Sequence, residues 1–183
     1  MGYSLQDFCR DTREILKNGS SRAQVEKVKT PMERLLVDPQ FLAEYFNDQH
    51  PQGLKRIYVD SQLGFEVMSY RYDKARASQP HDHGDSWAIY GQVREYTEMA
   101  VWERTDDGSD PDHATLREKT RYRLNPGQAG VYYGRELHSI AMPDHSRYLR
   151  VTGTDLETIE RLRIDAKAGR IERIRARQTG AAA

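Results

Sequence analysis

The sequence contains a single cysteine, Cys9, and this scarcity excludes two classes of small protein. One thiol cannot form a disulfide framework within the chain, and it cannot build a zinc cluster that needs several thiolates. No apolar run approaches the roughly 18 residues that a membrane-spanning helix requires. The N-terminal sequence also lacks the basic-then-apolar pattern of a secretion signal. These absences predict a cytoplasmic protein with no membrane partner.

An excess of charge of one sign is also missing, because 28 Lys and Arg residues balance 28 Asp and Glu residues. Nucleic-acid-binding domains usually carry a basic excess, so we expect no nucleic-acid partner. Residues 167–177 depart from this balance, with five basic side chains against one acid. A solvated chain end is the simpler interpretation of that stretch, and contact with an acidic partner is the alternative. Nothing in the sequence indicates an oligomeric state.

The chain of 183 residues divides into three segments that we expect to form one structural domain. Residues 1–53 show helical spacing of apolar residues, with Ser4 as a candidate N-cap and Pro31 as a break or kink in a helix over residues 21–36. Residues 54–153 contain short runs rich in aromatic and β-branched residues, separated by recurrent turn signals, which predicts a β barrel or sandwich. Residues 154–183 are predicted to form a helix, capped by Thr154 or Asp155, and a tail.

Two of the six histidines stand in the run His81-Asp82-His83. If this run is extended, residues i and i+2 face the same side, so both imidazoles can reach one ion while Asp82 points away. A third ligand has to come from elsewhere in the fold, and His138 is the best candidate because it lies in a strand-like run after a glycine-rich turn. His50, His113 and His145 stand in polar loops and are not expected to bind metal.

The segments HDHGDSWAIYGQVREYTEM and PGQAGVYYGRELHSIAM resemble the two motifs of the cupin superfamily. In the second motif, a ligand histidine follows a turn glycine by eleven positions, and Gly127 and His138 have the same spacing. The resemblance implies a mainly β fold, the cupin double-stranded β-helix or jelly-roll barrel, with an N-terminal helical segment and a C-terminal helix. The glutamate ligand of the first motif is missing, because Trp87 and Ala88 stand at its positions.

A cupin with three histidines and no carboxylate resembles the thiol dioxygenases that act on cysteine and on 3-mercaptopropionate. That resemblance implies Fe(II) held by His81, His83 and His138, with a small thiol and O₂ as substrates. It also implies an arginine for the substrate carboxylate, for which Arg56 and Arg161 are the candidates. The cysteine that crosslinks to a tyrosine in cysteine dioxygenase lies near Ala88, where this chain has none.

Aromatic residues near the two motifs are candidates to line the substrate pocket, namely Trp87, Tyr90, Tyr132 and Tyr133. Imidazole ligands suit iron, copper, nickel and zinc alike, so Zn, Ni or Mn remain possible in place of Fe(II). Two other functions therefore stay open. One is a metal-dependent lyase, isomerase or hydrolase, and the other is a cupin that binds a small ligand without catalysis.

Overall fold

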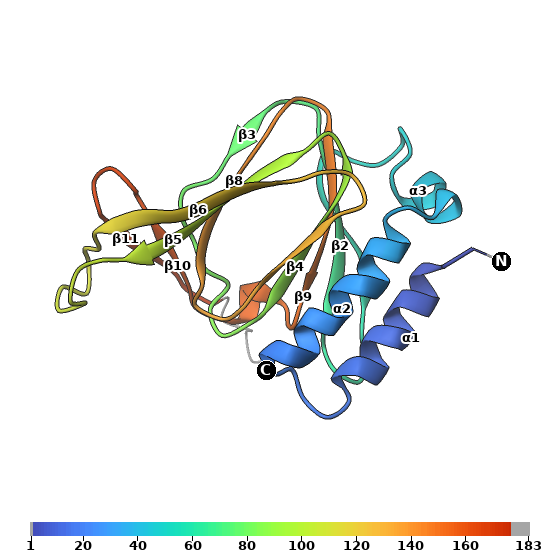
Figure 1. The fold of residues 1–183 in the computed structure, drawn as a ribbon, viewed down its shortest axis with the longest axis horizontal. Coiled ribbons are helices and arrows are strands. Elements are labelled where there is room, and N and C mark those ends of the chain that lie inside the picture. The colour runs from blue at the N-terminus through green and yellow to red at the C-terminus, as the bar shows by residue number, and fades with distance from the viewer. Residues whose placement is uncertain (1, 177–183) are drawn as a thin grey trace, which may run out of the picture.

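The computed structural model describes residues 2–176 and consists mainly of antiparallel β-strands (Figure 1). Three helices come first, α1 (Leu5–Leu16), α2 (Arg22–Leu35) and α3 (Pro39–Tyr45). The strands follow as β1 (Gly53–Val59), β2 (Glu66–Tyr72), β3 (Arg76–Ala77), β4 (Ala88–Arg94), β5 (Thr97–Arg104), β6 (Leu116–Leu124), β7 (Ala129–Tyr132), β8 (Leu137–Met142), β9 (Ser146–Thr152), β10 (Arg161–Ile164) and β11 (Ile171–Ile174). No helix within residues 2–176 has the length and apolar character needed to cross a bilayer.

Two sheets face each other and enclose one interior. The larger has the strand order β1-β2-β9-β4-β7 and the smaller has the order β3-β8-β5-β6. Neighbours in both orders are distant in sequence, as in β2 beside β9, so the chain wraps around the interior in the manner of a jelly roll. The predicted mainly β fold class is confirmed.

Strands β2, β4 and β9 are buried on both faces because the larger sheet lies between the helices and the smaller sheet. One face, with Val67, Ile89 and Val151, packs against the helices. The opposite face, with Met68, Tyr90 and other inward residues, packs against the smaller sheet. Since neighbouring residues of a strand point to opposite faces, the choice of face decides which side chains can reach the interior.

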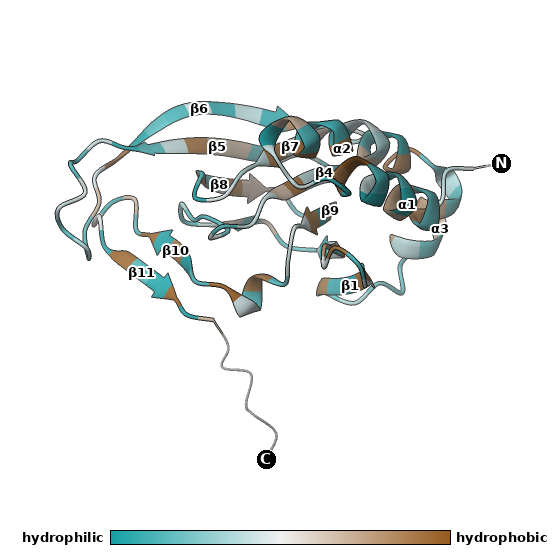
Figure 2. Cartoon of the chain, turned by 90° about the horizontal axis from the view of Figure 1, so that it is seen from below, coloured by the Kyte–Doolittle hydropathy of each residue, from teal (hydrophilic) through white to brown (hydrophobic). Residues whose placement is uncertain are grey.

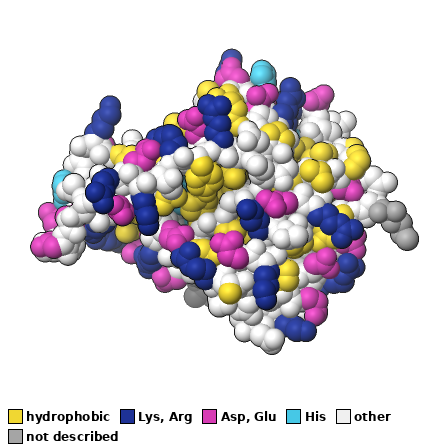
Figure 3. Space-filling model, viewed as in Figure 1, with side chains coloured by type: hydrophobic (Ala, Val, Ile, Leu, Met, Phe, Trp, Pro, Cys, Tyr) yellow, Lys and Arg dark blue, Asp and Glu magenta, His cyan; other side chains and the backbone are white. Residues whose placement is uncertain are grey.

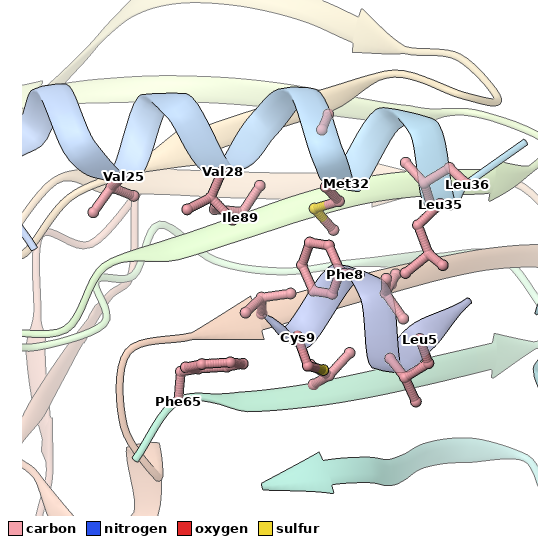
Figure 4. Close-up of a cluster of buried hydrophobic side chains, with 14 of the residues drawn as sticks. Leu5, Phe8, Cys9, Val25, Val28, Met32, Leu35, Leu36, Phe65 and Ile89 are labelled. Atoms are coloured by element: carbon pink, nitrogen blue, oxygen red, sulfur yellow. The ribbon is translucent and has the colours of Figure 1, made fainter. Parts of the chain in front are cut away.

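The helices form the predicted N-terminal layer. Ser4 caps α1 through its hydroxyl, which accepts a hydrogen bond from the Asp7 N–H at 3.1 Å. Helix α2 continues through Pro31 without a break. Figure 4 shows side chains of α2 pointing toward Ile89 of the sheet and toward Phe8 of α1. Hydrophobic and hydrophilic segments alternate along α1 and α2 (Figure 2), as expected for helices that bury one face.

The prediction of a C-terminal helix is wrong. Residues Leu156–Thr158 form one turn of 3-10 helix, and the chain then folds into the hairpin of β10 and β11. Leu162 and Ile164 fall at alternate positions, as in a strand, and the hairpin packs them with Ala114 and Leu137. The part of the predicted tail at residues 177–183 lies outside the described residues.

Candidate metal centre

His81, His83 and His138 converge on one point in the interior. Each offers a ring nitrogen, and the three ligand atoms lie within 4.8 Å of one another. The ring centroids of His81 and His138 are 4.5 Å apart, and those of His83 and His138 are 4.7 Å apart. Both His83 and His138 are almost completely buried. The three histidines that the sequence selected are therefore brought together by the fold.

Backbone pairing explains this convergence. His81 forms an isolated antiparallel bridge to His138, with N–H to carbonyl distances of 2.9 and 3.0 Å in the two directions. His83 lies two residues beyond His81 and turns to the same side, while Asp82 between them turns away. The Asp82 carboxylate accepts hydrogen bonds from the Gly84 N–H at 3.0 Å and the Leu162 N–H at 2.8 Å.

Hydrogen bonds orient two of the imidazoles. Nδ1–H of His81 donates to the Gln79 carbonyl at 2.9 Å, and Nδ1–H of His138 donates to the Glu136 carbonyl at 3.3 Å. In each case Nε2 is left as the lone-pair nitrogen for a ligand. Within the described residues, two buried ring nitrogens have no hydrogen-bond partner, Nε2 of His138 and Nδ1 of His83.

Buried nitrogens without partners are rare in proteins, and a metal ion would satisfy them. Burial lowers the pKa of all three imidazoles, that of His83 and His138 strongly, so the rings are neutral at physiological pH. Neutral imidazole is the form that binds metal. The three-histidine site is therefore compatible with a divalent metal, and its donor set adds no negative charge.

A cavity of about 210 Å³ opens beside the histidines. His81 lines it together with Tyr90 from β4, Tyr148 and Arg150 from β9, and Tyr70 from β2. The rings of Tyr70 and Tyr148 stack with centroids 4.4 Å apart. The Tyr90 hydroxyl lies 3.1 Å from Nε2 of His83 and links the aromatic wall to the candidate metal ligands.

Arg150 places a positive charge in this cavity. Its Nη2 lies 3.5 Å from Met68 Sδ, and its Nε has no hydrogen-bond partner among the described residues. The pKa of Arg150 is raised: burial alone would lower it, but the phenols of Tyr70, Tyr90 and Tyr148 outweigh that effect. The cavity therefore holds a permanently charged guanidinium that can take an anion.

A second cavity of about 400 Å³ adjoins the first, and the two share Arg76, Ala77, Ser78 and His81 as lining residues. Arg161, a predicted substrate-binding residue, lines this second cavity. Its Nε is buried without a hydrogen-bond partner among residues 2–176. The structure thus brings Arg161 close to the cluster, in a cavity that His81 also lines.

A larger groove of about 620 Å³ lies behind Tyr132. The Tyr132 ring stacks on His138 with centroids 4.1 Å apart, and its hydroxyl is 2.6 Å from that of Tyr122. Both tyrosines line the groove, whereas His81, His83 and His138 do not. We therefore regard the smaller cavity, which His81 lines directly, as the candidate substrate site.

Three of the predicted pocket residues lie elsewhere. Arg56 stands on the edge strand β1, where its guanidinium pairs with Glu66 at 3.2 Å and Asp155 at 3.3 Å. Because two carboxylates already hold it, and because it lines neither cavity beside the histidines, Arg56 is not placed to bind substrate.

Trp87 and Tyr133 do not line the cavity beside the histidines, and the reason is the alternation of side chains between the two faces of the sheet. Trp87 points to the helix-covered face, where it packs so closely on Gly153 that a Cβ there would lie 2.6 Å from Nε1. Tyr133 points outward, beneath the Arg22 guanidinium at 3.7 Å, and donates a hydrogen bond to Glu26 at 2.8 Å. Their inward neighbours, Tyr90 and Tyr132, are the two candidates that reach the histidines.

Arg150, Tyr148 and Tyr70 line the cavity but are not among the site residues predicted from the sequence. A signal for two of them was present, because Tyr148 and Arg150 alternate in the predicted strand RYLRVTG and so share a face. Which face is inward depends on pairing with β2 and β4, which the single sequence does not give. The remaining histidines lie apart from the cluster, since His113 and His145 are exposed and His50 binds the Ser69 hydroxyl at 2.6 Å.

Comparisons with known proteins show a likeness of fold. No protein-family model and no curated protein matches the sequence. KdgF from Halomonas sp. is similar, with 20% identity and a TM-score of 0.40 over 58% of this chain and 82% of that chain. The cupin domain of Schizosaccharomyces pombe Cnp3 has 10% identity and a TM-score of 0.41 over 56% of this chain and 60% of its own.

An oxalate oxidase in complex with the substrate analogue glycolate has 16% identity and a TM-score of 0.40. The similarity covers 61% of this chain and 55% of that chain. The matched region is thus less than two thirds of the oxalate oxidase and of the Cnp3 domain. The likeness concerns the fold and assigns no reaction to this chain.

Proposed function

We propose that this protein is a metal-dependent oxygenase that oxidises a small thiol carboxylate to a sulfinate with O₂. The observation that carries the proposal is the position of Arg150, a guanidinium without a carboxylate partner among the described residues, in the cavity that His81 lines. In the overall reaction both oxygen atoms end on sulfur, which loses four electrons while O₂ gains four. The product, RSO₂H, contains every atom of RSH and O₂.

The donor set supports an anionic substrate. Three neutral imidazoles leave the full charge of a divalent ion uncompensated, and a thiolate would offset part of it. Fe(II), the metal we favour, would supply the redox chemistry when it is bound by His81, His83 and His138. The protein's own contribution is to hold the substrate carboxylate at Arg150 and thereby to fix the distance of its sulfur from the histidines.

Tyrosines around the cavity would control protons and water. Burial raises the pKa of Tyr90 and Tyr148, so both phenols stay protonated at neutral pH. The Tyr90 hydroxyl, within hydrogen-bond distance of His83, is placed to donate to a bound polar group. The stacked pair of Tyr70 and Tyr148 shields the guanidinium from bulk water, which strengthens its attraction for a carboxylate.

Oxygen uptake tests the proposal. The protein is reconstituted anaerobically with Fe(II), and an oxygen electrode records uptake with cysteine, 3-mercaptopropionate and cysteamine. We expect uptake with a carboxylate-bearing thiol and little with cysteamine, which lacks the carboxylate. Arg150→Gln should raise KM or abolish turnover, whereas Arg117→Gln on the exposed strand β6 should not. Absence of uptake with every thiol would remove the proposal.

A second candidate is a non-oxidative metal-dependent lyase or isomerase, favoured by one observation. Tyr90 combines a protonated phenol with a neighbouring positive charge on Arg150 that makes loss of its proton easier. Such a phenol suits general acid–base catalysis next to a metal. Conversion of a carboxylate substrate without oxygen uptake, lost in Tyr90→Phe, would identify this alternative.

A further inference from the structure

Two guanidinium groups flank His81 from different cavities. Arg150 lines the smaller cavity and Arg161 lines the larger of the two, and both cavities share His81 and Ser78. Arg76 also lines both, and its guanidinium lies 4.4 Å from the centre of the Tyr72 ring. Each of two cavities that border His81 therefore contains one of these arginines.

Two other charged groups of the second cavity, Arg163 and Asp82, are already engaged. Arg163 pairs with Glu172 at 2.7 Å, so its charge is matched. The Asp82 carboxylate is buried and accepts two backbone hydrogen bonds. Arg161 differs from both, because its Nε is buried without a hydrogen-bond partner among residues 2–176, although Glu157, Asp155 and Asp82 lie near enough to raise its pKa.

Two such guanidinium groups close together are costly without an anion. Burial, and then the charge of Arg150, lower the pKa of Arg161, against the opposing effects of Glu157, Asp155 and Asp82. Buried cations are normally paired, so each site is complementary to an anionic group. A single carboxylate beside Arg150 would leave the buried Nε of Arg161 without a hydrogen-bond partner in the adjoining cavity.

We propose that the substrate carries two carboxylates, one bound by Arg150 beside the histidines and the other bound by Arg161 beyond His81. This inference rests on the proposed function only in taking the cavity beside His81 as the substrate site. A guanidinium fork matches a carboxylate through two parallel N–H donors, so two forks select a dicarboxylate over a monocarboxylate of the same length.

Binding without turnover tests this inference. The protein is loaded with Zn(II), which has no redox chemistry, and titrated calorimetrically with succinate and with butyrate, which have the same number of carbon atoms. We expect succinate to bind at least ten-fold more tightly. Arg161→Gln should lower succinate affinity to the level of butyrate and leave butyrate unchanged, whereas Arg150→Gln should weaken both. Arg117→Gln on β6 is the matched control and should change neither.

Equal affinities for the two acids, absence of succinate binding, or an Arg161→Gln variant with unchanged succinate affinity would each overturn the inference. Circular dichroism of each variant verifies that it is folded. The oxygen-uptake experiment stands apart from this titration. A preference for succinate in a protein that oxidises no thiol would leave the dicarboxylate site in place and remove the thiol oxygenase.

Discussion

The carboxylate of Asp82 accepts a hydrogen bond from the backbone N–H of Leu162 at 2.8 Å, across 80 positions of sequence. The same oxygen accepts the N–H of Gly84 at 3.0 Å. The Asp82 side chain thus adds to the backbone hydrogen bonds that fasten the segment with His81 and His83 to strand β10. It acts on the candidate metal centre by positioning its ligands.

Replacing Asp82 should therefore weaken both the fold and the metal site. Asp82→Ala leaves the buried N–H of Gly84 and the partly buried N–H of Leu162 without this acceptor, at a cost of about 1–3 kcal/mol for the buried one and less for the other. Urea unfolding measures the loss of stability, and a competitive chelator titration measures the loss of metal affinity. Asp82→Asn, which keeps an acceptor oxygen, should be milder. Asp85→Ala is the control, because that side chain is 85% exposed, and equal behaviour of the two alanine variants would contradict this role.

Metal content should depend on the three clustered histidines. Alanine at His81, His83 or His138 removes one of three ligands and should lower bound metal several-fold while circular dichroism stays unchanged. His113→Ala and His145→Ala, which change exposed residues, should retain the metal. Elemental analysis of the purified proteins gives the metal-to-protein ratio. Full occupancy in His138→Ala would exclude that residue as a ligand.

Much of the fold could be predicted from the sequence because strand periodicity and turn signals are local. The runs from WAIYGQV to RYLRVTG all became strands β4–β9. The C-terminal segment failed because Leu156, Ile159 and Leu162 also fit helical spacing. Its choice of hairpin depends on partners far away in sequence, Asp82 and the apolar residues near Ala114.

In the candidate site, too, the residues that local sequence signals indicate could be predicted, and those that depend on distant contacts could not. His81 and His83 are linked by strand periodicity, and His138 by its spacing from Gly127, whose φ of 85° marks the expected turn. The arginines could not be chosen in this way. Whether an arginine enters the interior depends on which face of the sheet its position on the strand points to, and on the carboxylates nearby. Glu66 and Asp155, for example, hold Arg56 at the edge of the sheet.

Stability should fall as the pH decreases below about 6.5, in part because of His50. Burial lowers the pKa of this imidazole, whose ring nitrogens contact the Ser69 hydroxyl and the Pro51 carbonyl. Below about pH 6.5 the unfolded chain binds more protons at this position than the folded chain does. The contribution of His50 to stability is therefore complete above about pH 6.5 and decreases as the pH falls below that value. Urea unfolding at pH 7.5 and pH 5.5 measures the change.

The pKa values of the three clustered histidines are lowered as well, so the contribution of His50 has to be separated from theirs by comparing variants. His50→Gln can keep a hydrogen bond to Ser69 and has no titrating group, so its stability should vary less between the two pH values than that of the wild type. His113→Gln, at an exposed position, should behave like the wild type. An identical pH dependence in the wild type and His50→Gln would show that His50 does not contribute.

The single thiol should be unmodified and unreactive in the folded protein. Cys9 is only 2% exposed and lies among the helix residues of the outer layer, while the candidate site faces the opposite side of the larger sheet. Burial raises the pKa of the Cys9 thiol to about 12, so almost no thiolate is present near neutral pH. Intact-mass measurement should match the unmodified chain, and a thiol reagent at pH 8 should label the native protein far more slowly than the urea-unfolded protein. A mass two hydrogens lower, mapped to Cys9 and a tyrosine of the candidate site such as Tyr90, would contradict this placement, because it requires the thiol to leave the helical layer. Rapid native labelling would show instead that helix α1 opens readily from the sheet.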